Sequence, residues 1–190
     1  MSSPNPGDIV HLWKITLPDG VHTITFEHGT TSGKRAVNVD GVELMRKNWM
    51  FSLVGVEKFK ISGRSAQISI VSNGWTFEYT LEIEGKSLKR FAEAEKKNTR
   101  TWLPNINRQP HRVVLEITNM DVYLDGEKVE TRGEFVSEGV ETHFDIDNVD
   151  CYIRSVSSGN KHKGLNYTLV VDDSDELPPT DNDFVESFPI

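Results

Sequence analysis

The sequence contains a single cysteine and no long apolar run. Because Cys151 stands alone among 190 residues, an intramolecular disulfide and the usual cysteine-based metal site are both excluded. No stretch approaches the roughly 20 apolar residues that a membrane-spanning helix needs. The first residues, MSSPNPGD, lack the basic and apolar regions of a signal peptide. We therefore expect a cytoplasmic protein with no membrane insertion.

Basic residues are also few, and the excess of acid is confined to one end. The chain has 21 Lys and Arg against 29 Asp and Glu, a net charge of −8. Residues 172–190 hold seven of these acids and no base, which leaves 22 acids against 21 bases over residues 1–171. A nearly neutral body has no field to attract nucleic acid, so we expect no nucleic-acid partner. The charge and prolines of the C-terminal segment predict disorder.

The sequence repeats itself at a spacing of 85 to 89 residues. The matches keep the same order in both halves, with gaps only where turns are expected. The matched positions include Trp13 and Trp102, His22 and His111, VNVDG at 37–41 and VYLDG at 122–126, Phe51 and Phe135, Phe59 and Phe144, Ala66 and Cys151, Ile68 and Ile153, and YTL at 79–81 and 167–169. This pattern indicates an internal duplication into two units of about 85 residues.

The local pattern in each unit is that of β-strands. In TFEYTLEIE at 76–84, apolar residues alternate with polar ones, which places the apolar side chains on one face of a strand. Asp-Gly and Asn-Gly dipeptides supply tight hairpin turns, and we count roughly seven to eight short strands per unit. The one helical pattern, SLKRFAEAEKK at 87–97, lies between the units. The sequence predicts an all-β protein of two tandem antiparallel β-sandwich domains from an internal duplication, joined by a short helical linker.

The expected boundaries follow from the repeat and from the composition of the two ends. They are a disordered N-terminus at 1–7, an N-terminal β-sandwich at 8–86, a basic helical linker at 87–100, a C-terminal β-sandwich at 101–173, and an acidic disordered tail at 174–190.

One segment, HGTTSGKR at 28–35, has the composition of a phosphate-binding loop. Its spacing is one residue short of that motif, and Arg35 stands where Ser or Thr would hold magnesium. The pattern that follows is a strand, so the helix dipole that stabilises phosphate is missing. We expect a glycine-rich hairpin loop instead of a nucleotide site.

The histidine, carboxylate and cysteine residues of the sequence do not have the spacings of a catalytic or metal site. The six histidines lie at spacings that form no ligand pair within one element. Glu27 with Glu116, and Asp40 with Asp125, resemble carboxylate pairs, but each is one position seen twice, and the aspartates begin turns. Cys151 has no partner that would activate it, and its alternation predicts a small core residue. We expect no catalytic residue, no metal site and no cofactor, and therefore a protein that is not an enzyme.

The two units differ most in one apolar segment. NWMFSLVG at 48–55 concentrates Trp49, Met50, Leu53 and Val54, where the second unit has the polar RGEFVSEG. Such a surplus is typical of an interaction surface, and it is equally consistent with a deeper core or packing against the helix. Changing Trp49 and Met50 to polar residues separates the two: a surface variant loses association with little change in melting temperature, whereas a core variant unfolds.

Four runs closely resemble the Fas apoptotic inhibitory molecule family. They are DGVHTITFEHGTTSGKRAVNVDG at 19–41, YTLEIEGKSLKR at 79–90, GEFVSEGVETHF at 133–144 and DCYIRSVSSG at 150–159. The resemblance covers about residues 8 to 173, and the acidic segment after 173 departs from it. It implies a cytosolic, non-enzymatic protein of two tandem β-sandwich domains without a cofactor. It further implies protection from death-receptor apoptosis, modulation of survival signalling, and protection against stress-induced protein aggregation.

We therefore expect a binding protein that restrains apoptosis or captures misfolded clients through its first domain. Its partners would be death-receptor signalling components or misfolded proteins, with self-association through the N-terminal domain as a further prediction. The alternative is a module that binds a small ligand, a sugar or a lipid, as small sandwiches often do. A concave aromatic face or an enclosed cavity would be its mark.

Overall fold

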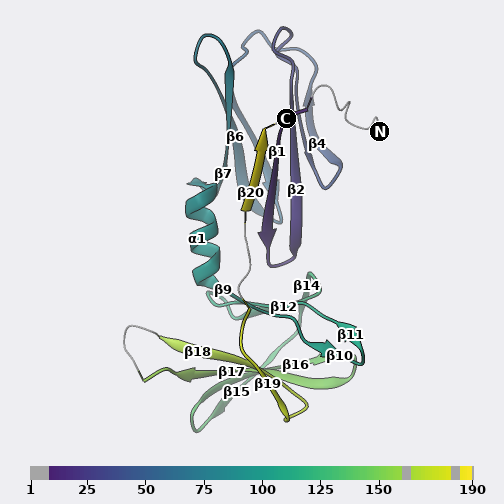
Figure 1. The fold of residues 1–190 in the computed structure, drawn as a ribbon, viewed down its shortest axis with the longest axis vertical. Coiled ribbons are helices and arrows are strands. Elements are labelled where there is room, and N and C mark those ends of the chain that lie inside the picture. The colour runs from purple at the N-terminus through teal and green to yellow at the C-terminus, as the bar shows by residue number, and fades with distance from the viewer. Residues whose placement is uncertain (1–8, 160–163, 181–184, 190) are drawn as a thin grey trace. The chain divides into compact units, whose positions relative to one another are not determined.

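The computed structural model describes residues 9–159, 164–180 and 185–189, and these form two compact units (Figure 1). The predicted disordered N-terminus at 1–7 lies outside the described residues. The described residues of the first unit are 9–17, 21–95 and 185–189, and those of the second are 18–20, 96–159 and 164–180.

The first unit contains two antiparallel sheets, whose strands follow the order β20-β1-β2-β3-β4 in one and β5-β6-β7-β8 in the other. The strands of the first sheet are β1 (Ile9–Leu17), β2 (Gly20–His28), β3 (Arg35–Val39), β4 (Val42–Lys47) and β20 (Val185–Pro189). Those of the second sheet are β5 (Gly55–Ile61), β6 (Arg64–Ser72), β7 (Phe77–Ile83) and β8 (Lys86–Ser87).

Side chains from both sheets meet in one core. In β1, Trp13, Ile15 and Leu17 are buried while Lys14 is exposed, which is the alternation expected of a strand with one face inward. β6 and β7, from the other sheet, contribute to the same core. The core residues from these and neighbouring strands include Ile24, Phe26, Val37, Ile61, Ala66, Ile68, Ile70, Leu81 and Ile83. The predicted alternation therefore gives the first unit an apolar interior of its own.

The predicted helix is present as α1 (Leu88–Asn98), but its first turns belong to the first unit. Phe91 is buried and joins the core of that unit, because removing an aromatic ring from water stabilises the folded protein. Glu95 accepts hydrogen bonds from Arg64 at 3.1 and 3.4 Å. The helix was expected to be a linker, and the structure differs in docking it on a domain.

The second unit has two larger antiparallel sheets and a short hairpin. Their orders are β14-β13-β12-β9, β15-β16-β17-β18-β19 and β10-β11. The strands are β9 (Thr99–Trp102), β10 (Asn105–Ile106), β11 (Gln109–Pro110), β12 (Val113–Glu116), β13 (Asp121–Leu124), β14 (Glu127–Val129), β15 (Arg132–Val136), β16 (Gly139–Ile146), β17 (Val149–Ser157), β18 (Leu165–Val171) and β19 (Asp175–Leu177). Trp102 and Cys151 lie in its core, where both are fully buried. The prediction of Cys151 as a core residue is confirmed.

Matched residues of the repeat occupy matched places in the ladders. Phe59 pairs with Ala66 between β5 and β6, and Phe144 pairs with Cys151 between β16 and β17. Likewise Ile68 pairs with Leu81, and Ile153 pairs with Leu169. The described protein is thus mostly β with one short helix, in several antiparallel sheets.

The C-terminal segment differs from the disorder expected of it. Residues 175–177 form β19, and Trp102 donates a hydrogen bond from Nε1 to the carbonyl of Leu177 at 2.9 Å. Residues 185–189 form β20, which pairs with β1. The disorder prediction weighed side-chain charge, whereas strand pairing uses backbone groups that every residue except proline carries in full. Residues 181–184 and 190 lie outside the described residues.

Within the described ranges, α1 is the one helix, and it lacks the length and apolarity needed to cross a bilayer.

Candidate functional site

Exposed apolar side chains gather on two loops of the first unit. Trp49, Phe51 and Val54 are 57%, 93% and 42% exposed, and Trp75 in the β6–β7 turn is 97% exposed. Gly55 pairs with Ile70, so β5 begins beside the end of β6 and both loops lie at one end of the unit. We call the set Trp49, Met50, Phe51, Leu53, Val54 and Trp75 the aromatic loop surface.

Two aromatic rings on this surface, those of Trp49 and Phe51, pack against each other. The centroids of Trp49 and Phe51 lie 4.2 Å apart at an interplanar angle of 75°, the edge-to-face arrangement that aromatic pairs prefer. Met50 and Leu53 are half-buried, and none of these four residues belongs to the core cluster of the unit. Of the four residues predicted for this site, Trp49 and Val54 therefore face solvent, and Met50 and Leu53 lie partly covered.

Arg35 holds the loop in place from inside the unit. Its side chain is buried, and its Nη2 donates hydrogen bonds to the carbonyls of Ser52 and Val54 at 2.7 and 2.9 Å. Its Nη1 donates to Oε1 of Glu57 at 2.7 Å. A planar guanidinium suits this task because it presents several donors in a fixed geometry. The segment 48–54 is therefore braced by charge-assisted hydrogen bonds.

The charge of Arg35 is balanced by a buried carboxylate. Glu57 is 2% exposed, and its second oxygen accepts a hydrogen bond from Nζ of Lys47 at 2.7 Å. Gly55 adjoins this group, and a Cβ built there would lie 3.2 Å from Nη1 of Arg35. A side chain at position 55 would therefore crowd the guanidinium of Arg35.

The glycine-rich segment at 28–35 supports the same loop. Met50 donates a backbone hydrogen bond to the carbonyl of Ser32 at 3.0 Å. Gly33 has a φ of +67°, and a Cβ there would run into the backbone of Met50. Lys34, the residue that would reach a phosphate, forms an ion pair with Glu27 at 3.0 Å. The expected hairpin loop is observed, and it serves as a cradle for residues 48–54.

Glu27 is an electrostatic anchor of this end of the sheet. The carboxylate is fully buried and also meets Arg46 at 3.2 Å. Burial alone would raise its pKa, but hydrogen bonds from Lys34 and Arg46 outweigh that effect, and the pKa lies below its ordinary value. The carboxylate therefore stays charged and is unsuited to act as a general acid near neutral pH.

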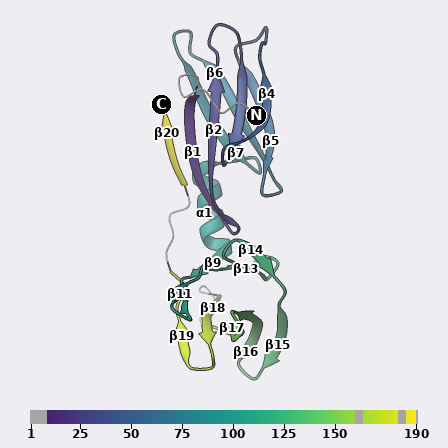
Figure 2. The ribbon, with the colours of Figure 1, turned by 90° about the vertical axis from the view of Figure 1, so that its right-hand side faces the viewer.

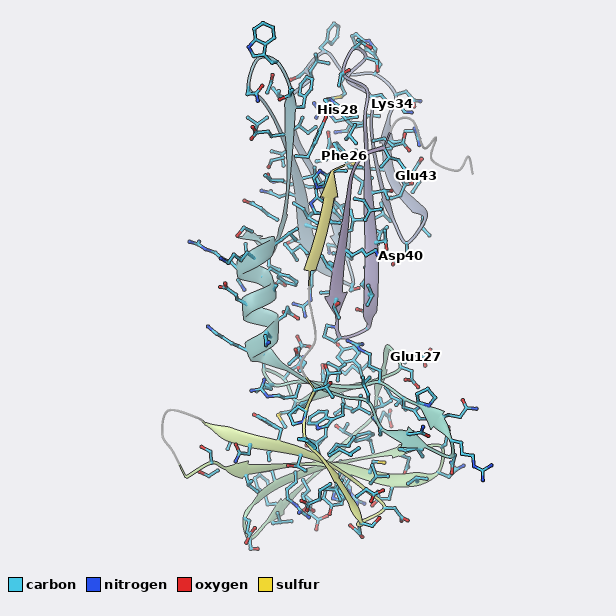
Figure 3. The ribbon with its side chains drawn as sticks, viewed as in Figure 1. Phe26, His28, Lys34, Asp40, Glu43 and Glu127 are labelled. Carbon is cyan, nitrogen blue, oxygen red and sulfur yellow. The ribbon has the colours of Figure 1, made fainter. Side chains whose placement is uncertain are left out.

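His28, labelled in Figure 3, lies opposite Arg35 in the ladder of β2 and β3. Its Nδ1 is 2.9 Å from the hydroxyl of Tyr79, and its ring packs edge-on against Phe77. Burial, and then the charge of Arg35, lower the pKa of His28, which favours the neutral ring. A neutral imidazole adds to the packing beneath the loop without adding charge to it.

The repeated histidines and aspartates form repeated pairs. Nδ1 of His22 lies 2.7 Å from Oδ2 of Asp40, and Nδ1 of His111 lies 2.8 Å from Oδ2 of Asp125. In each unit the other carboxylate oxygen accepts a hydrogen bond from the backbone N–H that follows the histidine, at 2.8 and 2.7 Å. These hydrogen bonds explain why both residue types recur with the repeat.

One of these pairs includes a serine. Oγ of Ser62 lies 3.2 Å from Nε2 of His22, which gives the order serine, histidine, aspartate. In the second unit the same histidine nitrogen faces a carboxylate, with Asp147 at 3.4 Å from His111. Because the His–Asp pair recurs with Asp147 in the place of Ser62, its common role does not depend on the serine hydroxyl.

Neither a reactive thiolate nor a cluster of metal ligands is found among the described residues. Burial, then the charges of Asp150 and Asp145, raise the pKa of the Cys151 thiol to about 11, so the reactive thiolate is scarce near neutral pH. Across the part of the chain that the structure describes, no group of three or more His, Cys, Asp or Glu side chains could hold a metal ion.

The segment of the second unit that matches residues 48–54 has a different secondary structure. Residues 132–136 form β15, which pairs with β16, whereas residues 48–54 are irregular. Phe135, the repeat mate of Phe51, is 89% exposed. An exposed phenylalanine is thus common to both units, and the neighbouring Trp49 and the bracing by Arg35 are particular to the first.

Sequence reasoning found the segment but missed part of the surface. Trp75 follows the Asn73-Gly74 turn, and a tryptophan at a hairpin tip was a signal that could have included it. Arg35 was considered only as a departure from the phosphate motif. Its pairing with Glu57 joins positions 22 residues apart and leaves no periodic trace in the sequence.

Comparison with known proteins gives a consistent result. The model of the family described as Fas apoptotic inhibitory molecule (FAIM1) matches residues 9–178. The chain is 51% identical over 174 residues to human Fas apoptotic inhibitory molecule 1, covering 90% of this chain and 97% of the human protein. The cattle protein of the same name is 51% identical over 174 residues, covering 90% and 86%, and the mouse protein is 50% identical, covering 90% and 97%.

Proposed function

The chain belongs to the Fas apoptotic inhibitory molecule family, and from that premise we propose that it restrains apoptosis by binding other proteins through the aromatic loop surface. Membership makes it a FAIM-like, anti-apoptotic and non-enzymatic protein of the Fas pathway. The site of binding, its partners and its place in the cytoplasm are the parts that we propose.

The observation that carries the proposal is exposed aromatic surface on a braced loop. Trp49, Phe51 and Trp75 expose apolar rings, and burying one such side chain contributes about 1.5 to 3 kcal/mol. Arg35 fixes the segment before a partner arrives, so less conformational entropy is lost on binding. Rigid aromatic anchors of this kind are enriched among the residues that dominate protein interfaces.

The partners that fit this surface are proteins with accessible apolar segments. Death-receptor signalling components and misfolded clients both meet that description, and a second copy of the chain would meet it through self-association of the first unit. Client capture would also account for protection against stress-induced aggregation, because a covered apolar segment cannot associate with others.

We further propose that the two units are β-sandwiches from a duplication. The matched pairs of Phe59 with Ala66 and of Phe144 with Cys151 support it, as does the recurrence of the His22–Asp40 pair. Each unit draws one core from two sheets, as sandwiches do. The domain limits we propose are close to 8–86 and 101–173, with the first turns of the segment 87–100 docked on the first unit.

The alternative of a small-ligand module has less support. A depression of about 440 Å³ on the first unit is lined by Lys58, Lys60 and Glu82, among others. A lipid there would displace water from these charged groups, which costs free energy. Exposed aromatic side chains lie instead on the loops at 49–51 and 75.

Cell protection tests the proposed function. Cells that lack the endogenous protein would receive wild type, Trp49→Ser/Phe51→Ser, or the control Leu44→Ser, which removes an apolar side chain that is 45% exposed on β4. After Fas stimulation, wild type and the control should lower caspase activation, and the double variant should not. Equal protection by all three, at equal expression, contradicts the assigned surface.

A further inference from the structure

A strand from the far end of the chain completes the first sheet. β20 pairs antiparallel with β1, and the register runs from His11 opposite Pro189 to Ile15 opposite Val185. Figures 1 and 2 both show β20 beside β1. The family model matches residues 9–178, so β1 lies within the matched part and β20 lies beyond it.

Without β20, β1 would be the edge strand on that side of the sheet. The order β20-β1-β2-β3-β4 makes β1 the outermost strand of the matched part on that side. An outermost strand presents a row of backbone N–H and C=O groups, which is a template for another extended chain. Strand addition to such an edge is a recurrent way in which proteins bind peptides.

We propose that the edge of β1 is a docking site for an extended segment of a partner protein, and that β20 is the occupant this chain supplies for itself. The inference rests on the proposed function only in taking the partner to be a protein. It concerns a different surface, because β1 and the aromatic loop surface share no residue.

The register describes the segment that fits. It lies antiparallel to β1 and pairs with residues 11–15 of that strand. The backbone hydrogen bonds of the ladder hold such a segment in an extended conformation. A segment with the sequence pattern of residues 185–189, VESFP, therefore matches the edge.

The resident strand is short compared with the edge. β1 has nine residues, and the register with β20 covers five of them. A tethered strand acts at an effective concentration in the millimolar range, so it excludes weak competitors. A partner segment that spans all of β1 can form more ladder pairs and displace it.

A proline substitution separates backbone pairing from side-chain effects. In full-length Glu186→Pro/Ser187→Pro, the two adjacent prolines remove the backbone donor of whichever residue faces β1. The matched control, Glu186→Ala/Ser187→Ala, changes the same side chains and keeps both donors. Amide hydrogen exchange at residues 11–15 should be faster in the proline variant and unchanged in the control. Equal protection in all three proteins overturns the proposal.

Binding in trans then tests the docking site itself. The probe is a fluorescein-labelled peptide with the sequence of residues 183–190, and a scrambled peptide is its control. The proline variant should bind the probe saturably, and wild type and the alanine control should bind it at least about tenfold more weakly. No saturable binding to the proline variant, or equal binding to the scrambled peptide, overturns the proposal.

Two checks keep the result decisive. If the proline variant loses its fold by circular dichroism, a chain that ends at Thr180 replaces it, since this retains every residue that the family model matches. A concentration-dependent dimer of wild type that dissociates in the proline variant would assign the edge to a second copy and overturn the proposal. Trp49→Ser/Phe51→Ser added to the proline variant should leave probe binding unchanged, so failure of the proposed function does not affect this test.

Discussion

At the scale of single residues, Arg35 braces the segment 48–54 of the aromatic loop surface. It is buried with Glu57 and holds two carbonyls of the loop, Ser52 and Val54. Removing one partner of a buried ion pair leaves the other charge poorly compensated, which is more costly than removing both.

We predict that Arg35→Met lowers the free energy of unfolding by about 3 kcal/mol, and that Arg35→Met/Glu57→Met recovers part of that loss. The double variant recovers stability because no buried carboxylate remains. Urea unfolding of the two variants measures the difference. A double variant less stable than Arg35→Met alone would contradict the account of this pair.

Glu27 gives a prediction with a pH dependence. Its folded-state pKa is depressed, so its ion pairs stabilise the protein above the unfolded-state pKa and lose that effect as pH falls through the folded-state value. Glu27→Gln should therefore lower the free energy of unfolding by about 1 to 3 kcal/mol at pH 7, and by less below about pH 4.

The control for this experiment is Glu78→Gln, which changes an exposed carboxylate on β7. Denaturant unfolding of wild type and both variants from pH 3 to pH 7 gives the comparison. A loss in Glu27→Gln that stays constant over this range would show that charge is not the source of its stabilisation.

At the scale of elements, the sequence predicted what is periodic and missed what is long-range. Alternation in 76–84 indicated β7, and the 3.6-residue pattern at 87–97 indicated α1, because burial of one face leaves a local trace. The strand β20 leaves no such trace, since its pairing depends on an edge more than 160 residues away. The hydrogen bond between Arg35 and Glu57 also leaves no periodic pattern in the sequence, because it joins single residues on different strands.

The docking of α1 on the first unit yields a prediction at this scale. Phe91→Ala removes a fully buried ring, and such changes destabilise by about 3 to 5 kcal/mol. Glu93→Ala, on the exposed face of the helix, should change stability little. Hydrogen exchange resolved by segment should show the loss in the first unit.

The second unit is the internal reference for that experiment. Its core is centred on Trp102 and Cys151 and contains no residue of α1. Exchange in β16 and β17 should therefore be unchanged in Phe91→Ala. An equal loss of protection in both units would mean that the helix does not belong to the first core.

At the scale of the whole molecule, the two units share several contacts and differ in their surfaces. The His–Asp pairs and the matched ladder positions are common to both units, so they are explained by folding. The braced aromatic loop and the β1 edge with β20 belong to the first unit. The sequence located the first of these differences, because a surplus of apolar residues against a polar repeat mate is visible without coordinates.

The family relationship and the exposed segment 48–54 both support the proposal that this protein acts by binding other proteins. Relatives at 50 to 51% identity carry the name of an apoptosis inhibitor, and the described residues expose the aromatic side chains that we propose as a binding surface. What the sequence alone left open, surface or core, depends on whether residues 48–54 pack inward. Their exposure and their absence from the core cluster favour the surface.

The most direct measurement is light scattering from citrate synthase heated with an equimolar amount of this protein and no ATP. Wild type and Leu44→Ser should slow aggregation, and Trp49→Ser/Phe51→Ser should not, with melting temperatures of all three close together because these side chains lie outside the core. Aggregation slowed as much by the double variant as by wild type, or not slowed by wild type, would contradict the claim that the aromatic loop surface binds proteins.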